Sequence, residues 1–185
     1  MADPGTASPV VQVVDYDPAW PARFAAIRDR IAPALGSAAQ SIEHVGSTSV
    51  PGLAAKPVID IDVVVADAAA SQAAIQALET LGYQHRGQMG IKDREAMAAP
   101  EGTERHHLYV CLAGSLALRN HLAVRNHLRA NASDRAAYDA LKRRLAREVP
   151  DMDSYVARKT DLIVALLRAE GFDLASLAEI GAANT

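Results

Sequence analysis

The sequence predicts an α/β to α+β fold, in which a mixed sheet with packed helices is followed by a helical C-terminal portion. The segment PVIDIDVVVA, residues 57–66, is dominated by β-branched residues and alternates in polarity, as strands do. Strand-like and helix-like segments interleave up to about residue 113, and the pattern is helical from Ser115 onward. This order of elements is typical of a sheet that carries helices on its faces.

The N-terminal elements are expected to be a short strand and a helix. VVQVVDY, residues 10–16, predicts the strand, and Asp17 with Pro18 supplies a cap and first-turn pair for the helix. The helix should end at Gly36, and its apolar residues recur at helical spacing: Phe24, Ile27, Ile31 and Leu35.

The remaining elements follow in order along the chain. SIEHV, residues 41–45, predicts a short strand that leads through a Gly/Ser-rich loop into the strand within residues 57–66. An Ala-rich helix closes on Gly82. Two further strands are expected, at residues 83–88 and 106–112, separated by a polar loop whose structure the pattern leaves open. The C-terminal helices are expected at roughly residues 115–130, 133–148 and 152–170.

Length and composition indicate one domain with a substantial core, because half of the 185 residues are hydrophobic. We expect a flexible leader at residues 1–9, a single domain at 10–172 and a tail at 173–185. Within the domain, the sheet core covers about 10–113 and the helical part about 114–172. A net charge of −3 and 4% aromatic residues offer neither a basic field nor many stacking platforms, so nucleic acid is not an expected partner.

Cysteine use and the apolar pattern predict a cytoplasmic protein. The single Cys111 excludes a disulfide within the chain and a cysteine-based zinc site. The start, MADPGTASPV, lacks a basic region followed by an apolar one, and no later apolar run approaches the length of a membrane span.

Asp60 and Asp62 form the first candidate site. Alternate residues of a strand share a face, so these two carboxylates project together, with Cα atoms roughly 6–7 Å apart. At a separation of about 4 Å the carboxylates would repel by about 4 kcal/mol at an effective dielectric constant of 20, so a cation should compensate them. Mg²⁺ suits such oxygens and bridges to substrate phosphates. The alternative is a strand that shows its polar residues to water, which the pair alone favours.

The loop before this strand is a candidate phosphate site. Its glycine lets the backbone approach a ligand closely, and its hydroxyls and amides can bind an anion, helped by a short helix that begins near Val50 or Pro51. The alternative is a plain turn capped by Ser and Thr. Lys56 meets a phosphate or is solvated, and His44 either joins the two aspartates at a metal or is hydrogen-bonded within its strand. The loop candidates for phosphate binding are Gly46, Ser47, Thr48 and Ser49.

The stretch IEHVGSTSVPGLAAKPVIDIDV resembles the diagnostic segment of the GrpB family, and its Gly-Ser pair followed by Asp-hydrophobic-Asp is similar to the nucleotidyltransferase superfamily signature. Further matches carry the resemblance across residues 10–167: YDPAWPARF, GYQHRG, HHLYVC, VRNHLRAN, YDALKRRLA and YVARKTDLI. In some bacteria this family occurs fused behind dephospho-CoA kinase. The resemblance implies a nucleotidyltransferase-like fold, with Gly46 and Ser47 seating phosphates and Asp60 and Asp62 holding Mg²⁺ or Mn²⁺.

The resemblance also implies a third carboxylate on a neighbouring strand, where this chain has RHHLYVCL with His106 and His107. Alternation allows only one of these histidines to face the aspartates. We take His107 as the candidate catalytic residue, since a neutral imidazole accepts a proton or binds another transition metal. Three loop carboxylates remain alternatives: Glu95, Glu101 and Glu104.

A stripe of His121, Arg125 and Arg129 recurs every four residues on the first C-terminal helix. It either clamps phosphates across the acidic strand, for which guanidinium groups are suited, or is a solvated face. Tyr155 and Lys159 either serve a site or hold a helix to the sheet, and the second role is the one we expect. A basic run is expected to be solvated: Lys142, Arg143, Arg144 and Arg147.

Two functions are consistent with these features. The first is a metal-dependent nucleotidyltransferase-like enzyme that acts on a nucleoside triphosphate and an unknown small acceptor. In it a histidine or a loop glutamate would activate the acceptor. The second is a non-catalytic nucleotide- or metal-binding module of the GrpB family, linked to coenzyme A metabolism.

Overall fold

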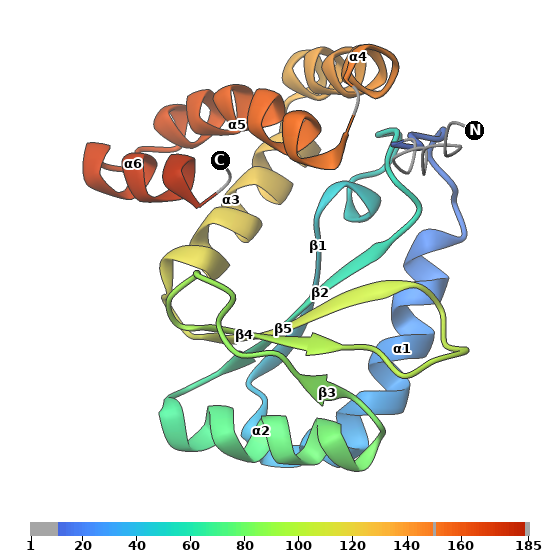
Figure 1. Ribbon diagram of the computed structural model, residues 1–185, viewed down its shortest axis with the longest axis vertical. Coiled ribbons are helices and arrows are strands. Elements are labelled where there is room, and N and C mark those ends of the chain that lie inside the picture. Colours follow the sequence, from blue (N-terminus) through green and yellow to red (C-terminus); the bar gives the residue numbers. More distant parts are fainter. Residues whose placement is uncertain (1–10, 150, 184–185) are drawn as a thin grey trace, which may run out of the picture.

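A five-stranded mixed sheet in the order β1-β2-β5-β4-β3 lies at the centre of the fold (Figure 1). The computed structural model describes residues 11–149 and 151–183, so the leader expected at 1–9 lies outside the described residues. Strands β2 and β5 pair in parallel and the other neighbours pair antiparallel. The strands are β1 (Ser41–Val45), β2 (Ile59–Val65), β3 (Gln84–His85), β4 (Arg94–Ala98) and β5 (His106–Leu112).

Helices cover both faces of the sheet. Helices α1 (Trp20–Leu35) and α2 (Ala68–Thr80) pack on one face, and α3 (Leu116–Ala130) packs on the other. Figure 1 shows the last three helices gathered at the far end of α3, away from most of the sheet. They are α4 (Ala132–Glu148), α5 (Met152–Ala169) and α6 (Leu174–Ala182). The predicted mixed sheet with a helical C-terminal portion is confirmed.

The main core lies between β2 and the helix pair α1 and α2. Alternation sends one set of β2 side chains toward these helices, where each buried aliphatic side chain contributes about 1.5–3 kcal/mol. Trp20 and Ile31 of α1 are almost fully buried against this face. The β2 side chains of this core are Ile59, Ile61, Val63 and Val65.

A second core ties the loop after β1 to the helical part. Val50 and Leu53 are buried in one cluster with Leu128 of α3, Tyr138 of α4 and Leu166 of α5. The loop that carries the Gly-Ser pair is therefore fixed by three helices as well as by the sheet.

The structure corrects three expectations about elements and adds a strand in the polar loop that the pattern left open. Residues 10–16 form no strand in their described part; Val14 makes only an isolated bridge with Ala55, because Val11 packs against the helical part instead. The expected helix near Val50 is a single 3₁₀ turn, η2 (Ser47–Ser49), that ends before it. Strand β4 lies in the polar loop and depends on pairing with β5, since REAMA is poor in β-branched residues. The expected tail contains α6, which buries Leu177 and Ile180.

Among the described residues, no helix combines the length and apolar character that crossing a membrane requires.

His127 joins three helices and gives a first prediction. Its Nδ1 lies 2.6 Å from Oε1 of Glu170 and its Nε2 lies 2.7 Å from Oδ2 of Asp134. Hydrogen bonding to Glu170, then to Asp134, raises the pKa of His127 above its ordinary value. A raised pKa in the folded state stabilises the fold below the unfolded pKa of about 6.5, and this contribution is lost as pH rises through the folded pKa.

We therefore expect His127→Gln to lower the free energy of unfolding at acidic pH by about 0.5–1 kcal/mol, because both carboxylates are partly exposed. The deficit should shrink toward alkaline pH. Urea unfolding of both proteins at about pH 5.5 and pH 8.5 measures it. A deficit that grew with pH would contradict the assignment.

Candidate active site

The acidic face of β2 meets histidines from two other elements. The parallel register with β5 places Asp60 beside His107, so His107 and not His106 faces the aspartates. Oδ1 of Asp60 lies 2.9 Å from Nδ1 of His107. Oδ2 of Asp62 lies 2.7 Å from Nδ1 of His121 on α3. Each of the two carboxylates is thus hydrogen-bonded to a histidine of the chain itself.

Asp62 is the more constrained of the two carboxylates. It is 0% exposed, and its Oδ1 has no hydrogen-bond partner within the described residues. Burial of the His121 ring opposes its charge, but the Asp62 carboxylate outweighs this and raises the pKa of His121. The pair of Asp62 and His121 is therefore most stable as a carboxylate next to an imidazolium. Within the described residues, Oδ2 of this carboxylate contacts His121 and Oδ1 has no hydrogen-bond partner.

Glu43 is a third carboxylate on the same face, which the sequence analysis missed. The antiparallel register of β1 places it beside Asp62. Nη1 of Arg125 donates to Oε2 of Glu43 at 2.8 Å and to the carbonyl of His44 at 3.1 Å. The hydrogen bond from Arg125 lowers the pKa of Glu43. Alternation of side chains along SIEHV could have placed Glu43 on the face of Asp62, but only once the register with β2 was known.

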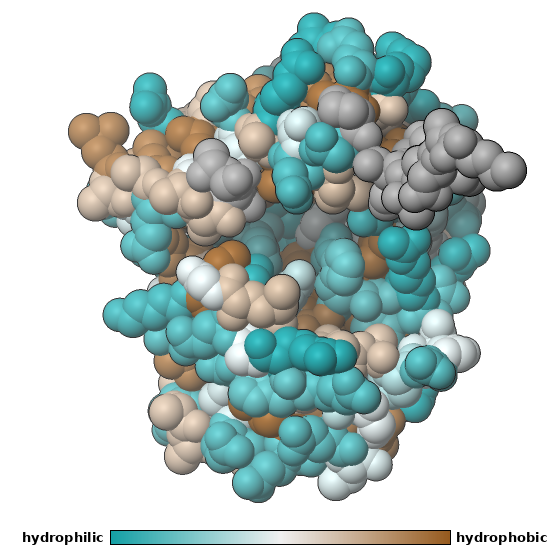
Figure 2. All heavy atoms as spheres, viewed as in Figure 1, coloured by the Kyte–Doolittle hydropathy of each residue, from teal (hydrophilic) through white to brown (hydrophobic). Residues whose placement is uncertain are grey.

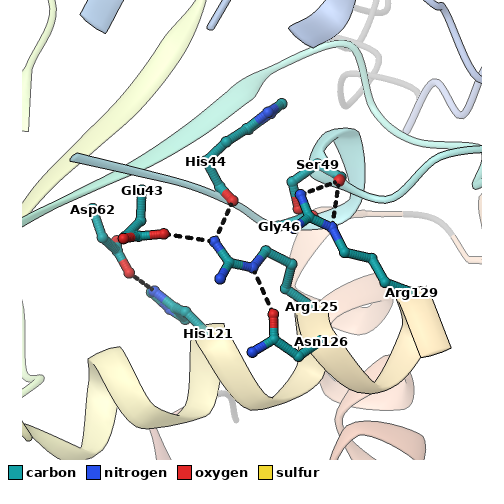
Figure 3. Close-up of polar contacts among 9 residues, drawn as sticks. All are labelled: Glu43, His44, Gly46, Ser49, Asp62, His121, Arg125, Asn126 and Arg129. Atoms are coloured by element: carbon teal, nitrogen blue, oxygen red, sulfur yellow. Dashed lines mark hydrogen bonds and ion pairs between the residues drawn. The ribbon is translucent and has the colours of Figure 1, made fainter. Parts of the chain in front are cut away.

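The stripe on α3 faces the sheet, as Figure 3 shows. His121 reaches Asp62, Arg125 reaches Glu43, and Arg129 donates from Nε and Nη2 to the carbonyl of Ser49 at 3.0 and 2.7 Å. The alternative of a wholly solvated face is therefore wrong. Both guanidinium groups bind the protein itself, and a role for Arg125 and Arg129 in phosphate binding stays a prediction.

The Gly46 turn lies directly against Asp60. Gly46 has φ +68° and ψ −174°, and a Cβ added there would lie 2.2 Å from Oδ2 of Asp60. Ser49 closes the turn by donating from its hydroxyl to the carbonyl of Gly46 at 2.6 Å. The buried hydroxyl of Thr48 donates to the carbonyl of Val58 at 3.4 Å and lies 3.0 Å from Nε2 of His44. Ser49 and Thr48 therefore hold the turn, and Ser47 and Thr48 line a pocket.

His44 does not join the two aspartates, contrary to the expectation of a metal site with one histidine. It is registered with Ile61, so it lies on the opposite face of the sheet from Asp60 and Asp62. Its ring stacks on Phe24 with the two centroids 4.7 Å apart, and Figure 3 shows it pointing away from Asp62. Burial lowers the pKa of His44 to about 4.

The alternative acids and His106 also lie elsewhere. Nε2 of His106 lies 2.8 Å from the hydroxyl of Tyr83 on the other face of the sheet. Glu95 contacts His85 at 2.7 Å, Glu104 contacts Arg23 at 3.4 Å, and Glu101 is exposed. None of these side chains is brought to the aspartates.

A pocket of about 420 Å³ opens between the acidic face and the helices. Figure 2 shows the molecule hollowed between its helical upper part and the sheet below. Gly46, Ser47, Asp60 and His107 line the pocket from the sheet side, with Asp62 buried next to it. From the other sides it is lined by Tyr138, Tyr155 and three lysines: Lys56, Lys142 and Lys159.

Lys142 was expected at the surface, but it is only 2% exposed. Its Nζ donates to the carbonyl of Ala54 and lies 4.8 Å from the centre of the Tyr138 ring. Burial lowers the pKa of Lys142 to about 7, and the charge of Lys159 acts in the same direction. Burial also lowers the pKa of Lys56. The helical period places Lys142 inward, which a count of charges in the run could not reveal.

A model of the GrpB protein family matches residues 10–169. The chain belongs to the GrpB family. A UPF0157 protein of Streptomyces coelicolor is 40% identical over 158 residues, which cover 85% of this chain and 82% of that protein. A dephospho-CoA kinase of Mycolicibacterium paratuberculosis is 29% identical over 175 residues, which cover 80% of this chain and 43% of the kinase. A link of this GrpB chain to coenzyme A metabolism stays a prediction.

Solved structures agree with the family and the fold. The conserved protein GrpB from Enterococcus faecalis matches with a TM-score of 0.74 at 31% identity, covering 86% of this chain and 99% of that one. Cid1 in complex with the UTP analogue UMPNPP matches with a TM-score of 0.53 at 14% identity. That match covers 82% of this chain and 49% of the Cid1 chain, and it shows the fold alone. The predicted nucleotidyltransferase-like fold is confirmed.

Proposed function

We propose that the protein is a metal-dependent nucleotidyltransferase-like enzyme that acts on a nucleoside triphosphate and a small acceptor. The observation that carries the proposal is the division of charge around the 420 Å³ pocket. Asp60 lies on one wall, while Lys56, Lys142 and Lys159 line others. Such a pocket is complementary to a triphosphate whose charge is shared between a divalent cation and ammonium groups.

The donor set fits Mg²⁺ or Mn²⁺ better than a metal held by histidines. No group of three or more His, Cys, Asp or Glu side chains that could hold a metal occurs in the described part of the chain. Mg²⁺ is commonly bound by one or two carboxylates, with substrate phosphates and water completing its six ligands. Asp60 and Asp62 supply two carboxylates, and Oδ1 of Asp62, to which no group in the described part of the chain is hydrogen-bonded, has capacity for a cation. When bound, the ion would polarise the phosphoryl oxygens and neutralise their charge.

His107 is suited to accept a proton from the acceptor. When Asp60 accepts a hydrogen bond from Nδ1–H of His107, the neutral ring has its lone pair on Nε2. The side chain of His107 is 48% exposed and lines the pocket, so a substrate group can reach it. The turn at Gly46 and Ser47 brings backbone and hydroxyl donors to the same wall. These residues would orient the phosphates while the acceptor is deprotonated.

Calorimetric titration with ATP, CTP, GTP and UTP, with and without Mg²⁺ or Mn²⁺, tests the proposal. We expect at least one nucleotide to bind with a Kd between about 1 μM and 1 mM, and only in the presence of the metal. Release of pyrophosphate upon addition of amines, alcohols or organic acids then separates an enzyme from a binding module. If none of the four nucleotides binds at millimolar concentration with either metal, the proposal is wrong.

A further inference from the structure

A second pocket, of about 310 Å³, is lined in part by His121 of α3. The connection between β3 and β4 forms one side of it, α3 forms another, and α6 forms the third. Asn120 and His121 line both this pocket and the nucleotide pocket proposed above. The remaining lining is largely apolar and includes Ile91, Leu116 and Ile180. Two cationic side chains, Lys92 and Arg94, also line the pocket.

Arg94 is the unusual side chain of this pocket. It is only 9% exposed, and its Nε is buried without a hydrogen-bond partner among the described residues. Its guanidinium carbon lies 4.3 Å from the centre of the Tyr109 ring, which holds the cation in place but offers no acceptor for its N–H groups. A buried guanidinium donor without an acceptor destabilises the fold, so this arrangement has a cost that an anionic ligand would offset.

The rest of the pocket favours an anion with one charge and an apolar body. Lys92 adds a second positive charge at the exposed side, and Glu179 on α6 carries a negative one. Arg94, Lys92 and Glu179 together carry a net charge of +1, since the charge of His121 is balanced by Asp62. This charge matches a single carboxylate, for which the guanidinium fork is suited. Ile91 and Leu116 would cover the hydrocarbon part of the ligand.

We propose that this pocket binds the carboxylate of the acceptor, a small hydroxy or amino acid, against Arg94. The inference rests on the proposed function, since it names the acceptor class for the same site. The far end of the acid would lie beside Asn120 and His121, which line both pockets, and would extend between them toward the nucleotide. There its hydroxyl or amine forms a bond to the α-phosphorus, the bond to pyrophosphate breaks, and the proton released passes to His107 or to water.

The test uses titration calorimetry without nucleotide, with sodium butyrate and sodium benzoate as probes and butyramide and benzamide as neutral matches. We expect the two acids to bind the wild-type protein and the two amides to fail. Arg94→Gln should weaken binding of the acids by about 10–100-fold, and Arg94→Lys by less. Arg119→Gln is the matched control, because Arg119 is exposed on α3 over the Phe172 ring and lies outside the pocket.

A stability readout separates ligand binding from a structural role of Arg94. If the buried Nε awaits a ligand, Arg94→Gln without ligand should melt at the wild-type temperature or above it. A fall of several degrees with unchanged acid binding would show that Arg94 serves the fold and would overturn the inference.

The two proposals fail separately. If nucleotides bind with metal but neither acid binds at concentrations on the order of 10 mM, the acceptor inference is wrong and the proposed function stands. If the acids bind through Arg94 but no nucleotide binds, the pocket is a carboxylate site and its role as an acceptor site is overturned.

Discussion

Replacing Asp60 and Asp62 together by asparagine should remove metal-dependent nucleotide binding, with a fall in affinity of at least about 100-fold. Loss of a residue that merely supports a metal ligand commonly costs 10–100-fold in metal affinity, so loss of both proposed ligands should cost more. Asparagine keeps the shape of each side chain, and its amide oxygen can still accept a hydrogen bond from Nδ1 of His107 or His121. The fold should therefore survive, and calorimetry with nucleotide and Mn²⁺ measures the change.

Asp29→Asn is the control for a lost negative charge. Asp29 is exposed on α1, pairs with Arg28 at 2.8 Å and is not among the residues that line the pocket. The Asp29→Asn variant should bind nucleotide with the affinity of the wild-type protein. Metal-dependent binding that persisted in the double variant would show that the metal is held elsewhere, and the assignment of Asp60 and Asp62 would be withdrawn.

Gly46→Ala should disturb the same site through the backbone. The combination of φ +68° and ψ −174° is essentially restricted to glycine, and forcing another residue into it costs about 1–3 kcal/mol. In addition, the new Cβ would lie 2.2 Å from Oδ2 of Asp60, so the carboxylate or the turn must move. We expect a lower free energy of unfolding by urea and at least about a tenfold loss of nucleotide affinity.

Gly52→Ala provides a matched comparison. Gly52 also has a positive φ, +78°, but nothing lies within 4 Å of a Cβ added there. It should lose stability from backbone strain while keeping nucleotide affinity. Equal losses of affinity in the two variants would mean that the contact between Gly46 and Asp60 has no part in binding.

Local patterns predicted the elements that obey one strong period. Strand β2 and helix α3 followed from alternation and from helical spacing. Alternation along β5 allowed only one of His106 and His107 to face the aspartates, and the register with β2 decides for His107. Strand β4 escaped because its pairing with β5, and not its own composition, makes it a strand. Helix α6 was not predicted, because its apolar residues are buried by packing against Leu167 of α5, which is a contact that its own short sequence does not indicate.

The site was predicted less completely, because contacts between distant elements decide it. His44 was expected at the metal and Glu43 was overlooked, since parity within β1 has no meaning until the register with β2 is fixed. Lys142 was assigned to the surface because its run is highly charged, yet burial against Ala54 and Tyr138 places it in the pocket. The buried Nε of Arg94, which has no hydrogen-bond partner among the described residues, lies in a pocket formed by β4 and α6 as well, so no local pattern could indicate it.

Helix α3 fixes the relative positions of three segments of the site. His121, Arg125 and Arg129 each contact a different segment, namely β2, β1 and the turn η2. Successive members of the set lie about 6 Å apart along the helix and near the same azimuth. One inserted residue between them would rotate the remainder by about 100° and break the later contacts together. In this stretch of the chain, changes of length are therefore far more damaging than single changes of residue type.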